Sequence, residues 1–210
     1  MKENDIQNDI ASIRSLMERS SKFISLSGFS GVMAGIYALI GAAVAYFMLY
    51  DGDNRMYSVH EYVETAFFED RMLIRLITIA GVVLVFSVGT GIMLTYKKAR
   101  RKNQPIWGKA SKDLLFSMLV PLLSGGLLIM ILLYRGYFGI VASASLIFYG
   151  LALIGASNFT FTDVKFLGLC DIILGLLAAC LPGYGLVFWA LGFGVLHIVY
   201  GSVMYYKYDR

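Results

Sequence analysis

The chain has 210 residues, of which 58% are hydrophobic and only 15% are charged, and its mean hydropathy is +0.70. A soluble domain of this size could not bury so much apolar surface, so the composition excludes a soluble globular protein and predicts a single-domain integral membrane protein. The formal net charge of +4 comes with a short basic loop, a pattern typical of membrane topology, and no nucleic-acid partner is expected.

Residues 1–23 predict a cytoplasmic amphipathic helix. Ile6, Ile10, Ile13 and Met17 recur at steps of three and four, and charged side chains occupy the other face. The simpler interpretation is a helix that lies on the inner membrane surface or extends the first span. The alternative is a docking helix for a protein partner or a second copy of the chain, because a repeating apolar seam can form a coiled coil.

Six continuously apolar stretches are each close to the length of about 20 residues that a helix needs to cross a bilayer. The expected fold class is therefore all-α, a polytopic bundle over residues 24–206 that is surrounded by membrane lipids and followed by a short tail at 207–210. The spans are expected at Ile24–Tyr50, Met72–Tyr96, Leu114–Tyr134, Phe138–Ser157, Val164–Leu181 and Tyr184–Tyr206.

The connecting loops predict the orientation. The loop at 97–113 is rich in lysine and arginine, whereas the loop at 51–71 is acidic. Because short basic loops stay in the cytoplasm, the basic loop and both termini are expected inside and the acidic loop outside.

The acidic loop contains a spacing that could hold a metal ion. His60 and Glu64 would lie one helical turn apart and could share a metal ion. The pattern lacks the second histidine of the HExxH motif, so an interfacial helix with a solvated acidic face is the simpler interpretation. No resident metal or cofactor is expected.

The third span contains a predicted helix break at Pro121, with Gly125 and Gly126 close behind it. Proline removes a backbone donor and bends a helix, and adjacent glycines weaken the helix further. A broken helix at this depth can line a cavity or a substrate path, whereas a plain kink would be satisfied by a neighbouring helix.

A short internal repeat could indicate that the two halves of the chain are related. The pentapeptide Ala-Leu-Ile-Gly-Ala occurs at 38–42 in the first span and again at 152–156 in the fourth. Three spans followed by three spans would make an inverted repeat, a common plan among transporters. The match does not extend into the flanking residues, so chance in an apolar sequence is the competing explanation.

The last two spans each carry one ionisable residue at similar depth. Asp171 lies 11 positions before Pro182, and His197 lies 12 positions after Gly185, on either side of a tight turn. At about 1.5 Å per residue both lie roughly 16–18 Å from that turn, where ionisable groups are costly and mark functional sites by default. Each belongs to a face of small residues that allows close helix packing: Gly168 and Gly175 in the fifth span, Gly194 and Gly201 in the sixth.

This spacing predicts a contact between Asp171 and His197, which has two interpretations. The pair could share a proton and serve transport or sensing, or it could be a structural hydrogen bond that holds the hairpin in register. Tyr149 and Tyr200 could extend the polar network.

Catalytic motifs are absent from the sequence: no nucleophile elbow, phosphate-binding loop or dinucleotide fingerprint occurs, and no catalytic residue is assigned. We therefore expect a non-enzymatic membrane protein that binds a small or lipidic ligand, or a protein partner, through a cavity near the pair. A proton-coupled transporter is the alternative, and an intramembrane enzyme comes third.

The chain resembles a family of uncharacterised bacterial six-span proteins. The resemblance covers most of the chain. Its most specific motifs are Tyr149–Leu153, Phe166–Gly168, Leu174–Leu176, Pro182–Gly185, Phe188–Trp189, Gly192–Gly194, Leu196–Ile198 and Tyr200–Gly201. It implies a bacterial inner (cytoplasmic) membrane protein and brings no established mechanism. Members are often labelled hypothetical membrane protein or beta-carotene 15,15′-monooxygenase. The oxygenase label implies iron held by several histidines, which a chain with two histidines, one in each of two distant segments, does not supply.

Overall fold

The computed structural model describes residues 27–50, 70–101 and 106–209. The amphipathic helix predicted at 1–23, the His60–Glu64 pattern and most of the acidic loop lie outside these residues. Within them every regular element is helical, which confirms the all-α class.

The long helices coincide with the apolar runs of the sequence. They are α2 (Gly28–Tyr50), α4 (Asp70–Arg101), α5 (Lys109–Tyr134), α6 (Val141–Ser157, preceded by the 3-10 turn η1 at Phe138–Ile140) and α7 (Val164–Cys180). A last, continuous helix is formed by α8 (Gly185–Trp189), the π-helical segments η2 (Ala190–Leu196) and η3 (Tyr205–Asp209), and α9 (His197–Met204) between them.

Five helices in the described part of the chain are long and apolar enough to cross a membrane. They are Gly28–Met48, Leu73–Arg101, Lys109–Tyr134, Phe138–Ser157 and Gly185–Asp209. The remaining predicted span coincides with α7, which has 17 residues and is therefore about 26 Å long at 1.5 Å per residue. The structure thus supports a membrane-embedded helical bundle.

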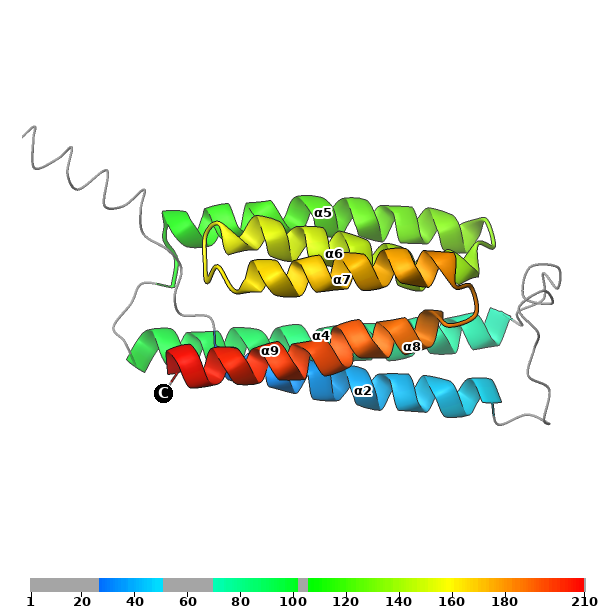
Figure 1. Cartoon of the computed structure of the whole chain (residues 1–210), viewed down its shortest axis with the longest axis horizontal. Coiled ribbons are helices and arrows are strands. Elements are labelled where there is room, and N and C mark those ends of the chain that lie inside the picture. Colours follow the sequence, from blue (N-terminus) through cyan, green and yellow to red (C-terminus); the bar gives the residue numbers. More distant parts are fainter. Residues whose placement is uncertain (1–26, 51–69, 102–105, 210) are drawn as a thin grey trace, which may run out of the picture.

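The helices form two layers of three, which lie one above the other in Figure 1. In one layer α6 packs against both α5 and α7; in the other α2 packs against both α4 and α9. The layers meet where α6 and α7 contact α8 and η2. The last two helices therefore belong to different layers, although only a short turn separates them in the sequence.

Glycines explain why α7 packs closely on α6 and α9 packs closely on α2. A Cβ atom on Gly168 would lie 2.6 Å from the carbonyl oxygen of Gly150, so α6 and α7 can approach this closely only without side chains. In the other layer, a Cβ on Gly201 would lie 2.5 Å from the backbone nitrogen of Val32 in α2. The predicted packing glycines Gly175 and Gly194 continue these two contacts, against α6 and α2 respectively.

Helix α5 corrects the predicted break at Pro121, because it runs without interruption from Lys109 to Tyr134. Pro121 has no N–H for the carbonyl of Ser117, four residues earlier, and this carbonyl instead faces Gly155 of α6. Gly125 packs tightly against Phe148 of α6, whereas Gly126 faces open space. The neighbouring helix thus accommodates the proline, and the helix stays whole.

Candidate functional site

The candidate site lies between the layers, where three helices bring together Tyr149 of α6, Asp171 of α7 and His197 of α9. Directly before His197 the last helix adopts the π-helical form of η2, in which Gly192 and Gly194 are buried. A π-helical turn widens the backbone ring and frees carbonyl groups, and such turns occur frequently at functional sites. This π-helical segment was not predicted from the sequence, although the motif Gly192-Phe193-Gly194 in the middle of a span could have indicated it.

His197 is held by two hydrogen bonds and is only 5% exposed. Its Nδ1 atom lies 2.8 Å from the carbonyl oxygen of Gly192, and its Nε2 atom lies 2.8 Å from the hydroxyl of Tyr149. A carbonyl can only accept, so Nδ1 carries the hydrogen and donates it. In the neutral ring Nε2 is then the acceptor, and the hydroxyl of Tyr149 donates to it.

Aromatic rings surround this hydrogen-bonded pair. Phe193 stacks on the imidazole of His197 with ring centroids 6.0 Å apart, and it contacts the ring of Tyr149 at 4.9 Å. Trp189 packs on the other side of Phe193 at 5.2 Å. These rings leave the imidazole few orientations, so its two nitrogens stay directed at their partners.

Asp171 is completely buried, with an exposed fraction of 0%. Neither of its carboxyl oxygens has a hydrogen-bond partner among the residues that the structure describes. A Cβ on Gly192 would lie 2.9 Å from Oδ1, so the carboxyl group rests against the π-helical backbone. An ionised carboxylate without a partner costs several kcal/mol in such a place, so this group is set up to take a proton or a hydrogen-bond donor.

The predicted direct contact between Asp171 and His197 is not made through polar atoms. Both imidazole nitrogens have other partners, and both carboxyl oxygens have none within the described ranges. The physical reason is the packing of the two helices into different layers, which inserts Tyr149 from α6 beside the imidazole. The structure thus brings Tyr149 and His197 together, with Asp171 next to them across Gly192.

Tyr200 takes part in a different contact. It packs against the hydrophobic cluster that includes Leu167 and Met204. Ser143 of α6 is a further buried polar residue that no sequence pattern indicated. Its hydroxyl is buried without a partner among the described residues, and its carbonyl oxygen faces Gly175, one helical turn along α7 from Asp171.

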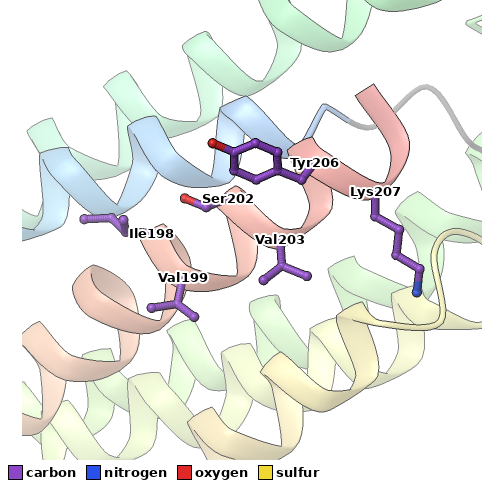
Figure 2. Close-up of a pocket in the computed structure, with 6 residues that line it drawn as sticks. All are labelled: Ile198, Val199, Ser202, Val203, Tyr206 and Lys207. Atoms are coloured by element: carbon purple, nitrogen blue, oxygen red, sulfur yellow. The ribbon is translucent and has the colours of Figure 1, made fainter. Parts of the chain in front are cut away.

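An open groove of about 680 Å³ lies near these residues but does not include them (Figure 2). All of its lining belongs to the last helix: Ile198, Val199, Ser202, Val203, Tyr206 and Lys207. Val199 and Val203 are about half exposed, so the groove is part of the outer surface of the bundle. It is distinct from the buried cluster of Tyr149, Asp171 and His197.

In the part of the chain that the structure describes, no three histidine, cysteine, aspartate or glutamate side chains lie close enough together to hold a metal ion. The donor set around Asp171 is instead one carboxyl, one phenol and one imidazole, which suits proton or hydrogen-bond donor recognition. Comparisons with protein-family models, with curated proteins and with solved structures find no match for this chain.

Proposed function

We propose that the chain is a non-enzymatic protein of the bacterial inner membrane that crosses the bilayer six times. The five apolar helices and the apolar α7, which lies alongside α6, support this count. The basic end of α4, with Lys98, Arg100 and Arg101 in its last turn, supports a cytoplasmic location for that end and for the C-terminus beside it. Membership of the six-span bacterial family that the sequence resembles is part of this proposal.

The function that the geometry supports best is binding of a small or lipidic ligand that offers a hydrogen-bond donor to Asp171. One observation carries it: a fully buried carboxyl group has two oxygens without a partner among the described residues. Buried acceptors are nearly always satisfied in native proteins, so an unsatisfied pair at membrane depth indicates a missing donor. A docking role for residues 1–23 stays a separate prediction.

Proton-coupled transport is the second candidate, and the hydrogen bond between Tyr149 and His197 favours it. If the imidazole takes up a proton at Nε2, this nitrogen becomes a donor to the phenol oxygen. The phenol hydrogen is then released to point elsewhere, and Asp171 is the nearby carboxyl group whose oxygens have no partner among the described residues. Protonation of one group would thereby change the hydrogen bonding of the next.

The test compares Asp171→Asn with Asp113→Asn, a carboxyl in the first turns of α5 away from the site. Native mass spectrometry of the protein purified in lipid nanodiscs would record any small molecule or lipid that stays bound. We expect bound ligand in the wild type and in Asp113→Asn but not in Asp171→Asn, with thermal unfolding unchanged. Equal occupancy in all three proteins would remove Asp171 from ligand binding.

The same variants separate the second candidate in proteoliposomes. Proton-coupled transport predicts that an imposed pH gradient drives substrate uptake only with Asp171 intact. Ligand binding that persists without gradient-driven uptake leaves the binding protein and excludes the transporter. If Asp171→Asn fails to fold while Asp113→Asn folds normally, the carboxyl group has a structural role instead.

A further inference from the structure

The two helices that carry Asp171 and His197 are joined at one end only. The turn from α7 to α8 is short: Tyr184 donates to the carbonyl of Leu181 at 3.3 Å, and Gly183 has the positive φ of 94° that favours glycine. This covalent turn lies at the opposite end of the bundle from the C-terminus (Figure 1). Helix α4 ends and α5 begins at that far end, so the chain also joins the two layers there. The helices α7 and α9 are joined to each other only by their own turn, so these two can separate at the end far from it.

At this far end the layers are held by a clamp centred on Asp163, in the loop before α7. Its carboxylate accepts hydrogen bonds of 2.8 Å from the ammonium group of Lys207 and from the hydroxyl of Tyr208, both in η3. The ring of Tyr208 also stacks on Phe161 at a centroid distance of 4.0 Å. The loop of one layer is thus fastened to the C-terminal helix of the other.

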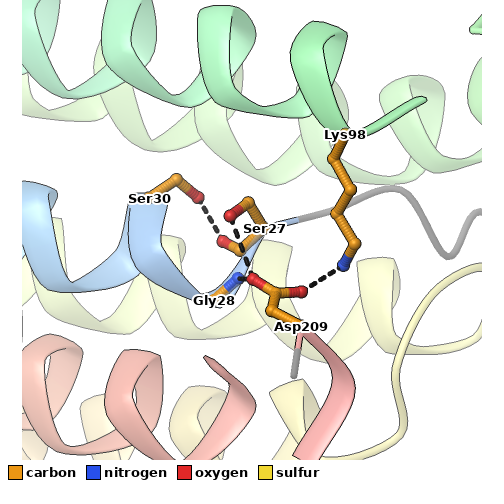
Figure 3. A network of polar contacts seen from close by, with 5 residues as sticks. All are labelled: Ser27, Gly28, Ser30, Lys98 and Asp209. Atoms are coloured by element: carbon orange, nitrogen blue, oxygen red, sulfur yellow. Dashed lines mark hydrogen bonds and ion pairs between the residues drawn. The ribbon is translucent and has the colours of Figure 1, made fainter. Parts of the chain in front are cut away.

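A second set of contacts anchors the C-terminal helix within its own layer (Figure 3). Asp209 accepts hydrogen bonds from the hydroxyl of Ser27 at 3.1 Å and from the backbone N–H of Gly28 at 2.9 Å, and it pairs with Lys98 of α4. The ammonium of Lys98 also lies 5.4 Å from the ring centroid of Phe161. Asp209 therefore fixes η3 to α2 and α4. At this end the layers are joined by the hydrogen bonds to Asp163, by the Phe161–Tyr208 stack and by the Lys98–Phe161 contact, and the bonds to Asp163 are the polar ones among these three.

Between the clamp and Asp171 the interface is filled by an apolar plug. Its buried residues come from both layers, with Leu153, Phe161, Val164 and Leu167 on one side and Met204 on the other. All five residues are apolar and buried, so this plug is an apolar barrier between the clamp and Asp171.

We propose that the Asp163 clamp is a latch whose release lets α7 swing away from α9 about the α7–α8 turn and opens a path from the cytoplasmic end to Asp171. The inference rests on the proposed role of Asp171 as the binding site. The ion pair with Lys207 is partly exposed, with side-chain exposures of 54% and 25%, and pairs of this kind exchange readily with water. The plug separates with the layers because its members belong to both.

Cys170 provides a native reporter for this motion. It precedes Asp171 on α7 and is partly buried. In a Cys180→Ala background it is the only thiol, since the chain has two cysteines. Its rate of modification by a charged, membrane-impermeant methanethiosulfonate reagent, added to inside-out vesicles, measures access from the cytoplasmic side.

We expect Asp163→Asn to raise this rate about tenfold, because the loop loses its charge-assisted hydrogen bonds and opens more often. Tyr208→Phe, which keeps the ring stacking and removes one donor, should give a smaller rise and guards against misfolding of the first variant. Lys165→Gln is the matched control, because Lys165 is an exposed charge in the first turn of α7 with no part in the clamp. It should leave the rate unchanged.

Unchanged rates in both clamp variants, or an equal rise in Lys165→Gln, would overturn the latch. So would an equal rise when the reagent is added from the outer face. The labelling assay needs no ligand, so its result is independent of the binding experiment. If labelling does not change in the clamp variants but Asp171→Asn still loses the bound ligand, the latch is rejected and the binding site is kept. Faster labelling in the clamp variants together with unchanged ligand occupancy in Asp171→Asn would keep the latch and reject the site.

Discussion

The close contact between α6 and α7 allows a quantitative prediction for Gly150→Ala. The new Cβ would lie 2.5 Å from the carbonyl oxygen of Gly168 and 2.7 Å from Cγ1 of Ile172. Real Cβ atoms stay more than 3.0 Å from such neighbours, so the helices must separate by several tenths of an ångström. The first obstacle is backbone and cannot rotate away. Overpacking of this kind costs typically about 1–3 kcal/mol.

Thermal unfolding in detergent checks this magnitude. For a chain of this size about 1 kcal/mol corresponds to about 2–4 °C, so the midpoint should fall by roughly 2–12 °C. Gly81→Ala in α4 is the matched control, because nothing lies within 4 Å of its Cβ and alanine is the better helix former. Its midpoint should stay constant or rise slightly.

The reciprocal variant sharpens the test. A Cβ on Gly168 would meet the carbonyl of Gly150 at 2.6 Å, so both substitutions push the same two helices apart. The double variant should therefore cost less than the sum of the single ones. Strict additivity, or a midpoint in Gly150→Ala equal to that of the α4 control, would refute the close backbone contact between α6 and α7.

Two further predictions concern polar groups. Tyr149→Phe removes the hydroxyl that donates to Nε2 of His197 and should lower the free energy of unfolding by about 0.6–1 kcal/mol, which is a small fall in the unfolding midpoint. The nitrogen-15 chemical shift of the imidazole should change clearly. An unchanged shift would contradict the hydrogen bond. The hydrogen bond from Lys207, and after it the one from Tyr208, lowers the pKa of Asp163 in the folded protein. The ionised Asp163 therefore stabilises the fold at any pH above its pKa in the unfolded chain, and this stabilisation is lost as the pH falls through its lower pKa in the folded protein. Thiol reactivity near the clamp should therefore be flat from neutral to mildly acidic pH and rise only in strong acid; a rise near neutral pH would show that another group controls the latch.

Several features of the fold follow from the sequence because they depend on local composition. Long apolar runs predict the helices, and the described helix bounds match the expected spans within a few residues. The burial of Asp171 and His197 was predicted in the same way, from their depth and from the small residues beside them. Both are buried in the structure, with exposures of 0% and 5%.

The partners of these residues could not be predicted in that way. Adjacent antiparallel spans suggested an Asp171–His197 contact, but α7 packs on α6 through Gly168, and α9 packs on α2 through Gly201. The two interpretations of Pro121 were likewise decided by a neighbouring helix, because α5 is unbroken and the carbonyl of Ser117 lies against Gly155 of α6. A sequence with glycines on many faces does not say which faces meet.

The sequence by itself determined a helical membrane bundle and the two ionisable residues buried in its last helices, because hydropathy and depth are properties of each helix alone. The tertiary structure decided that Tyr149 holds His197, that Asp171 keeps two oxygens without partners in the described residues, and that Asp163 fastens the layers. Lipid is as apolar as the helix surfaces, so hydropathy does not favour one apolar face over another. The choice depends on shape complementarity between segments far apart in the chain.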